Sequence, residues 1–151
     1  MQQFLNSFRY AFSGLVAAVR AERNLRFHLC IAFYVYLFSF FYPFAVAEYC
    51  IITLLVGGVL ALELVNSALE RTVSRPSPEK YREAGIVKDM AAAAVLVFSM
   101  AAAVCGVLLF WQPPIFAQIV SWFLAHPLWL LPLALSLAGS GWFVFIWRRP
   151  G

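Results

Sequence analysis

Residues 49–69 read YCIITLLVGGVLALELVNSAL, an apolar stretch interrupted by a single charged residue, Glu63. As an α-helix this stretch is about 31 Å long, which is enough to cross the hydrocarbon core of a bilayer. The whole chain has the same character, since 64% of its 151 residues are hydrophobic and 12% are charged. A soluble domain carries about 25% charged residues, so the composition excludes an ordinary soluble domain, a disordered chain and a nucleic-acid-binding protein.

Further apolar stretches on both sides of residues 49–69 predict a multi-pass membrane protein. Residues 27–47 and 90–111 contain no Asp, Glu, Lys or Arg, and residues 128–147 form another uncharged stretch. Each is long enough to cross a bilayer as a helix. Residues 115–126 are shorter, and we expect them to be an interfacial or re-entrant connection. The sequence thus predicts four membrane spans.

The N-terminal residues 4–20 predict an amphipathic helix that lies on the membrane surface. Its apolar residues recur at steps of three and four: Phe4, Phe8, Phe12, Leu15 and Val19. Aromatic anchors beside cations suit the headgroup layer, although an ordinary packing helix has the same pattern. We therefore expect an all-α membrane protein with a surface helix, a transmembrane core of three helices within residues 1–111, and a C-terminal extension, residues 112–151, that adds a fourth transmembrane helix.

The distribution of positive charge predicts the orientation in the membrane. All eleven Lys and Arg residues precede the first span, lie between the second and third spans, or follow the fourth. Because cytoplasmic loops carry the excess of Lys and Arg, the N- and C-termini are expected on the cytoplasmic side of the membrane. The three cysteines stand singly in apolar stretches, which argues against disulfides and against a zinc site.

Three polar residues on the second span are the strongest candidates for chemistry. In a helix, Glu63, Asn66 and Glu70 share a sector of about 60°. Glu63 lies about 10 Å inside the cytoplasmic end of that span. A carboxylate at such depth is costly and should face the interior of the protein with a partner, so it indicates a functional site more than a structural hydrogen bond.

Other charged residues are expected at the same cytoplasmic layer. Glu22 precedes the first span, and Lys88 with Asp89 stands where the third span begins. Each could by itself be a surface ion pair or a flanking charge. Together, several carboxylates and one lysine suit Mg²⁺ and the phosphates of a nucleotide, since Mg²⁺ is usually bound through one or two carboxylates plus phosphate oxygens.

Two segments carry a resemblance to a known family. Glu63-Leu-Val-Asn66-Ser-Ala-Leu-Glu70, followed by Lys88-Asp89 with small residues, resembles the pattern E-x-x-N-[ST]-A-[IL]-E and K-D of the bacterial diacylglycerol kinase and undecaprenol kinase family. Residues 10–14, YAFSG, and residues 22–28, ERNLRFH, match as well. The resemblance covers residues 4 to about 111 and implies a small integral-membrane lipid kinase, usually a homotrimer, that uses MgATP.

The resemblance also implies roles for individual residues. Glu63 is similar to the general base that deprotonates the lipid hydroxyl, and Asn66 to a residue that orients the reacting groups. The implied Mg²⁺ ligands are Glu22 and Glu70. The implied ATP contacts are Tyr10, Glu22, Glu70, Glu79, Lys80, Tyr81, Lys88 and Asp89. The implied lipid-binding residues are Ser7, Phe8, Arg9, Phe12, Asn24, Arg26 and His28.

Three departures from the family pattern fall on residues that concern the nucleotide. Ser74 replaces an Asp, Tyr81 replaces a His, and Gln3 replaces a basic residue. They leave open an alternative, a non-enzymatic membrane subunit or an inactive pseudokinase of the same fold. Residues 22–28 resemble the undecaprenol-kinase branch of the family slightly more than the diacylglycerol-kinase branch, so the resemblance implies undecaprenol as the favoured substrate. It also implies a location in the bacterial inner membrane.

Overall fold

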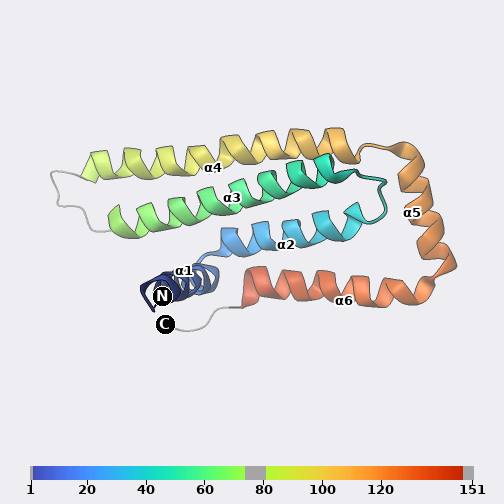
Figure 1. Cartoon of the computed structure of the whole chain (residues 1–151), viewed down its shortest axis with the longest axis horizontal. Coiled ribbons are helices and arrows are strands. Elements are labelled where there is room, and N and C mark those ends of the chain that lie inside the picture. The colour runs from blue at the N-terminus through green and yellow to red at the C-terminus, as the bar shows by residue number, and fades with distance from the viewer. Residues whose placement is uncertain (1, 74–80, 148–151) are drawn as a thin grey trace.

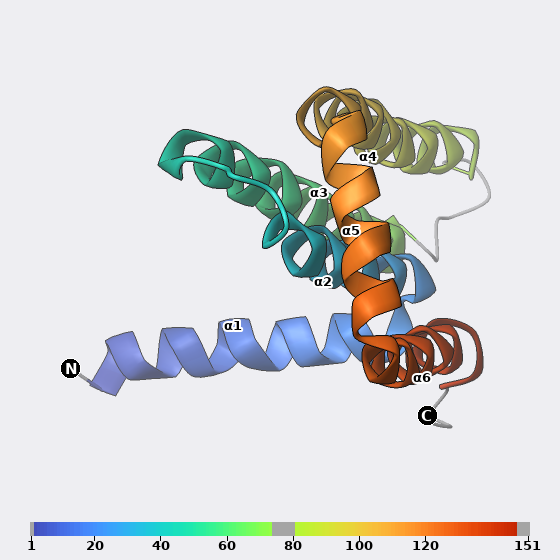
Figure 2. The same cartoon turned by 90° about the vertical axis from the view of Figure 1, so that its right-hand side faces the viewer.

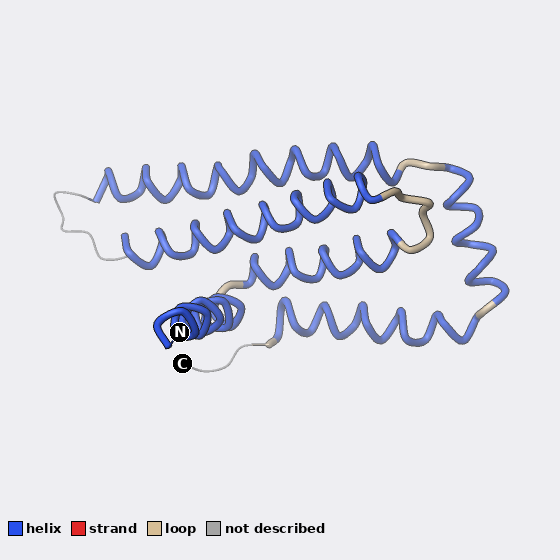
Figure 3. The backbone as a smooth tube through the Cα atoms, viewed as in Figure 1, coloured by secondary structure: helices blue, strands red, loops and turns tan. Residues whose placement is uncertain are grey.

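The computed structural model describes residues 2–73 and 81–147 of the chain, and these residues form helices joined by short connections (Figures 1 and 3). In chain order the elements are α1 (Gln2–Ala21), α2 (Arg23–Ser39), α3 (Val46–Val73), α4 (Tyr81–Phe110), α5 (Pro113–Ala125), the 3₁₀ turn η2 (Pro127–Trp129), α6 (Leu130–Gly141) and the π-helical turn η3 (Trp142–Ile146). No strand occurs within the described ranges, which confirms the all-α prediction.

Four helices run along the long axis of the molecule in alternating directions, in the spatial order α4, α3, α2, α6 (Figure 1). Helix α3 packs on α4 and on α2, and η3 closes the row by packing on α2. Helices α1 and α5 run across this axis, and they do so at opposite ends of the molecule (Figures 1 and 2). The row therefore has one end formed by α1 and the α2 N-terminus, and another end formed by α5.

Three helices of the described chain are long and apolar enough to cross a membrane: Val46–Val73, Arg82–Phe110 and Pro127–Ile146. Three of the four predicted spans thus correspond to helices of sufficient length. The remaining one, residues 27–47, differs from expectation because its helix α2 covers only Arg23–Ser39. Pro43 follows in the α2–α3 connection, and a proline disfavours helical backbone at the preceding residue and has no N–H to donate.

Helix α4 also begins earlier than the apolar stretch indicates, at Tyr81, so Lys88 and Asp89 lie inside the helix and not at its start. Hydropathy marks the part of a helix that is apolar and says nothing about polar turns that continue it. Residues 115–126, expected to be an interfacial or re-entrant connection, fall mostly within helix α5, which runs across the ends of the neighbouring helices (Figure 2). Pro113 and Pro114 stand at its first positions, where a missing N–H costs nothing.

Candidate active site

A buried polar cluster on α3 is the centre of the candidate site. Glu63 is 3% exposed, Asn66 is 8% exposed and Ser67 is 4% exposed. Glu63 and Asn66 therefore face the interior from one side of the helix, as the spacing predicts, while Glu70 one turn further along is exposed near the helix end. The side-chain oxygen of Asn66 is buried without a hydrogen-bond partner. A buried acceptor without a partner carries a desolvation cost, which a hydroxyl group of a ligand would remove.

The α1–α2 junction brings a second polar segment to this cluster. Asn24 lies within hydrogen-bonding reach of the Glu63 carboxylate, and the carboxylates of Glu22 and Glu70 are close enough to act on Glu63 electrostatically. Glu22 is the N-cap residue of α2 in extended conformation, and its side chain makes no capping bond. Its carboxylate instead pairs with Arg71 at the end of α3, with 3.3 Å between Oε1 and Nη2. The junction and α3 thus share one layer of charge.

The donor chemistry of this layer suits a hard divalent cation. Within residues 2–73 and 81–147, no three His, Cys, Asp or Glu side chains are arranged to hold a metal by themselves. Mg²⁺ does not need such a cage, because one or two carboxylates and the phosphate oxygens of a nucleotide usually complete its octahedron. Glu22 and Glu70 supply that kind of donor beside the buried Glu63.

Lys88 and Asp89 lie on α4, which packs along α3. Lys88 is half-buried and Asp89 is exposed. Both belong to the end of α4 that lies beside the end of α3 carrying Glu70 (Figure 1). Glu79 and Lys80 lie outside the described residues, as does the side chain of Tyr81.

The predicted residues of the surface helix stand apart from the buried cluster. Ser7, Phe8, Arg9, Tyr10 and Phe12 are all exposed on α1, which leads away from the other helices (Figure 2). Tyr10 is 72% exposed. The structure of one chain therefore does not bring Tyr10 to the other residues expected to contact ATP, and it leaves this face of α1 open to a lipid headgroup layer or to another chain.

Arg26 and His28 follow the junction but point to different surroundings. The Arg26 side chain is buried, and its guanidinium donates hydrogen bonds to backbone carbonyl groups of α1 and η3. His28 is half-buried and lines a groove between α2, α3 and α4. Among the residues expected to bind lipid, His28 thus lines an apolar cavity.

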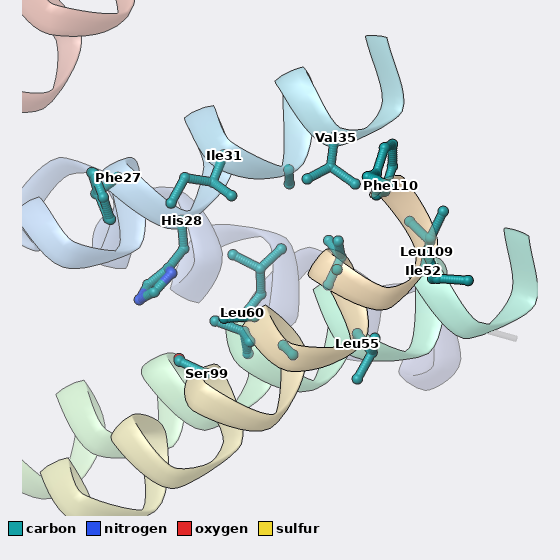
Figure 4. A pocket seen from close by; sticks show the side chains of 16 residues that line it. Phe27, His28, Ile31, Val35, Ile52, Leu55, Leu60, Ser99, Leu109 and Phe110 are labelled. Carbon is teal, nitrogen blue, oxygen red and sulfur yellow. The ribbon is translucent and has the colours of Figure 1, made fainter. Parts of the chain in front are cut away.

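This groove has a volume of about 360 Å³ and is almost entirely apolar (Figure 4). On α3 it runs from Ile52 to Leu60, one helical turn short of Glu63. His28 and Ser99 are its polar lining residues, and the Ser99 hydroxyl is buried without a hydrogen-bond partner. Figure 4 shows both near one end of the groove, with Phe110 toward the other.

The sequence did not reveal this groove. Its α4 wall includes three small residues in the middle of the groove, Ala102, Ala103 and Gly106. Small side chains on a transmembrane helix usually indicate close helix packing, and here they leave space between α4 and α2. That difference depends on how the helices are placed, so no pattern along the chain reports it.

Comparison with known proteins shows which family the chain is similar to. The model of the prokaryotic diacylglycerol kinase family matches residues 9–110. The chain is 37% identical to the undecaprenol kinase of Bacillus subtilis over 110 residues, which cover 73% of this chain and 89% of that relative. It is 35% identical to a diacylglycerol kinase of Synechocystis over 117 residues, 77% of this chain and 66% of the relative. It is 31% identical to the diacylglycerol kinase of Haemophilus influenzae over 97 residues, 64% of this chain and 82% of the relative. No solved structure matches the chain.

Proposed function

This chain belongs to the prokaryotic diacylglycerol kinase family and is a lipid kinase, and we propose that it transfers the γ-phosphate of ATP to the hydroxyl group of a membrane lipid in a Mg²⁺-dependent reaction. The observation that carries the proposal is the buried Glu63 carboxylate, which lies between a layer of charged side chains and the apolar groove. A charged nucleotide and an apolar lipid can both reach a carboxylate in that position.

Glu63 acts as the general base in this proposal. As the lipid oxygen attacks the γ-phosphorus, its proton moves to the Glu63 carboxylate, the new O–P bond forms, and the bond to the bridging oxygen breaks to release ADP. A positioned base of this kind contributes about 10²- to 10⁴-fold in rate. Asn24 orients the carboxylate through its side chain, and the unpartnered Asn66 oxygen accepts a hydrogen bond from a hydroxyl group of the nucleotide.

Glu22 and Glu70, both close enough to Glu63 to act on its carboxylate, would hold Mg²⁺. The cation, when bound, neutralises charge on the phosphates, which is most of what catalysis of phosphoryl transfer requires. Arg71 pairs with Glu22 and holds its carboxylate in this layer. Lys88 and Asp89 on α4 are proposed to contact the nucleotide, with the cation of Lys88 directed at phosphate oxygens.

The groove supports a long hydrocarbon chain as the apolar part of the substrate. A diacylglycerol carries ester groups next to its hydroxyl, whereas a polyprenol is hydrocarbon immediately beyond it. The groove wall is almost entirely apolar, and the chain is 37% identical to an undecaprenol kinase. We therefore propose a polyprenol such as undecaprenol as the better substrate and diacylglycerol as the weaker one.

The location and assembly follow from the same features. We propose that the end of the molecule bearing α1 and the charged layer faces the cytoplasm, where ATP is present, and that the N- and C-termini lie there. Large apolar residues are exposed along α4, among them Met90, Val97 and Leu108. Such a surface contacts lipid or another copy of the chain, and we propose a homotrimer.

A direct assay tests the proposed reaction. The purified full-length protein in mixed micelles receives MgATP and either undecaprenol or diacylglycerol, and the phosphorylated lipid is measured. We expect product from both lipids with a higher kcat/KM for undecaprenol. A folded protein that phosphorylates neither lipid contradicts the proposed reaction, and a higher kcat/KM for diacylglycerol contradicts the proposed preference.

A further inference from the structure

One buried cation, Arg26, links the C-terminal extension to the α1–α2 junction. The family match ends at residue 110, and the extension beyond it returns along α2 as α6 and η3 (Figure 1). Arg26, in the first turns of α2, is 3% exposed. An arginine is seldom buried to this degree unless its donors are paired, so the groups around it identify what it holds together.

The Arg26 guanidinium lies at the C-terminal ends of two different helices. Its Nη1 donates to the carbonyl oxygens of Val19 at 2.9 Å and Arg20 at 3.2 Å, both in the last turn of α1. Its Nη2 donates to the carbonyl oxygen of Val144 at 3.3 Å, in η3. The last carbonyl groups of a helix have no partner within the helix, and the helix dipole places partial negative charge there. One cation therefore satisfies groups at both helix ends.

The surroundings of the guanidinium belong to the extension as well. Its central carbon lies 6.0 Å from the ring centroid of Phe143 and 5.9 Å from that of Trp147. Val144 is 4% exposed, the one buried residue of η3. These contacts make the end of the extension part of the environment of Arg26, and they are absent from any chain that stops at residue 110.

A second link holds the extension along α2. The Tyr34 hydroxyl is 3.1 Å from the Ser136 hydroxyl and 3.1 Å from the Ser140 hydroxyl, which stand one turn apart on α6. Because this link lies outside the site and does not involve Arg26, it offers a way to loosen the extension while the arginine stays intact.

We propose that Arg26 is a positioning residue through which the C-terminal extension fixes the α1–α2 junction, and with it Glu22 and Asn24, against Glu63. Glu22 and Asn24 lie within four residues of Arg26 on the same short segment. Without the link to Val144, the end of α1 and the start of α2 lose the group that holds both to η3. The expected effect on Mg²⁺ binding rests on the proposed function. The coupling between the α1–α2 junction and η3 does not depend on it.

The test compares Arg26→Met with Arg23→Met in the full-length protein. Arg23 is an exposed arginine in the same turn and serves as the matched control. Hydrogen–deuterium exchange is measured at residues 18–24 and 142–147, and the Mg²⁺ concentration for half-maximal lipid phosphorylation is measured in parallel. Changes to residues that orient metal ligands commonly weaken metal affinity about 10- to 100-fold.

We expect Arg26→Met to raise exchange in both segments together and to raise the half-maximal Mg²⁺ concentration by about tenfold or more. Arg26→Lys keeps the positive charge but lacks the forked guanidinium group that reaches three carbonyl groups. Its effects on exchange and on the Mg²⁺ requirement should therefore lie between those of the wild type and those of Arg26→Met. Tyr34→Phe should produce a smaller rise in the Mg²⁺ requirement. Arg23→Met should behave as the wild type.

Two results overturn the proposal. Unchanged exchange at residues 18–24 in Arg26→Met shows that the link does not hold the junction, and an unchanged Mg²⁺ requirement shows that it does not position the site. If Arg26→Met fails to fold, Trp147→Leu removes a ring beside the guanidinium without removing the cation, and the same two measurements decide. If the wild type phosphorylates no lipid, the proposed function fails, and the exchange experiment still decides the coupling.

Discussion

Gly58 sets the contact between α3 and α4, the two helices that carry Glu63 and Lys88. A Cβ atom added at Gly58 would lie 2.5 Å from Cε1 of the Phe98 ring and closer still to its Cζ. Carbon atoms in ordinary contact are about 3.5–4.0 Å apart, so the ring or the helix backbone has to move by about 1 Å. Gly57 next to it would meet nothing within 4 Å, which makes it the matched control.

The substitutions Gly58→Ala and Gly57→Ala have the same effect on the helix backbone and differ in the contact with Phe98. Each replaces glycine within a helix, which by itself favours the helix by about 1 kcal/mol. Overpacking of a well-packed contact costs about 1–3 kcal/mol. The free energy of unfolding of Gly58→Ala should therefore lie about 1–3 kcal/mol below that of Gly57→Ala.

The effect on activity should exceed the effect on stability. Moving α4 away from α3 also moves Lys88 and Asp89 relative to Glu63, and a displacement of about 1 Å can cost about 100-fold in rate. Gly58→Ala should lower kcat, whereas the kcat of Gly57→Ala should stay near the wild-type value. A smaller side chain opposite, in Gly58→Ala/Phe98→Leu, should recover part of both losses.

Reversible unfolding in mixed micelles, followed by far-ultraviolet circular dichroism, measures the stability difference, and the lipid phosphorylation assay measures kcat. Equal unfolding free energies for the two alanine variants would refute the argument from packing, since the ring would then swing aside at no cost. A normal kcat beside a reduced stability would refute the link between this contact and the spacing of the site.

Three further predictions concern the base, the groove and the opposite end of the molecule. Glu63→Gln should abolish turnover while chromatographic size and helical content stay as in the wild type, and wild-type turnover would remove Glu63 from the role of base. Gly106→Leu adds bulk to the groove far from Glu63, so KM should rise for long-chain alcohols and not for short-chain ones; an equal effect on both chain lengths would contradict binding of the chain in the groove. Tyr42→Phe removes the hydrogen bond from the Tyr42 hydroxyl to the Phe110 carbonyl, which is 2.9 Å long, and should lower the free energy of unfolding by about 0.5–1.5 kcal/mol. Tyr49→Phe removes a longer bond, 3.3 Å to the Ser39 carbonyl, and should lower it less. A larger loss for Tyr49→Phe in unfolding experiments would count against this ranking of the two bonds.

The helical class, the number of apolar stretches and the buried face of α3 could be predicted from the sequence. Each depends on composition or on the helical spacing of apolar residues. A carboxylate such as Glu63 in an apolar stretch is costly when it faces lipid, so it faces the interior of the protein. Helix ends were less predictable. Helix α2 stops at Ser39 because of the proline in its connection, and α4 starts at Tyr81 because polar turns extend the helix beyond the part that hydropathy marks.

The sequence by itself determined that this protein spans a membrane, which of its residues are charged within it, and to which family residues 9–110 belong. Only the tertiary structure decided what those charges meet: that Glu22 and Asn24 come to Glu63, and that Arg26 faces the ends of α1 and η3 and not the groove. The physical reason is the range of the forces involved. Which residues become buried depends on composition and on the helical spacing of apolar residues, and both can be read along the chain. A hydrogen bond needs two particular groups within about 3 Å of each other, which only the folded chain provides. Val144 is 118 residues from Arg26 along the chain, and only the folded row of helices places its carbonyl beside that guanidinium.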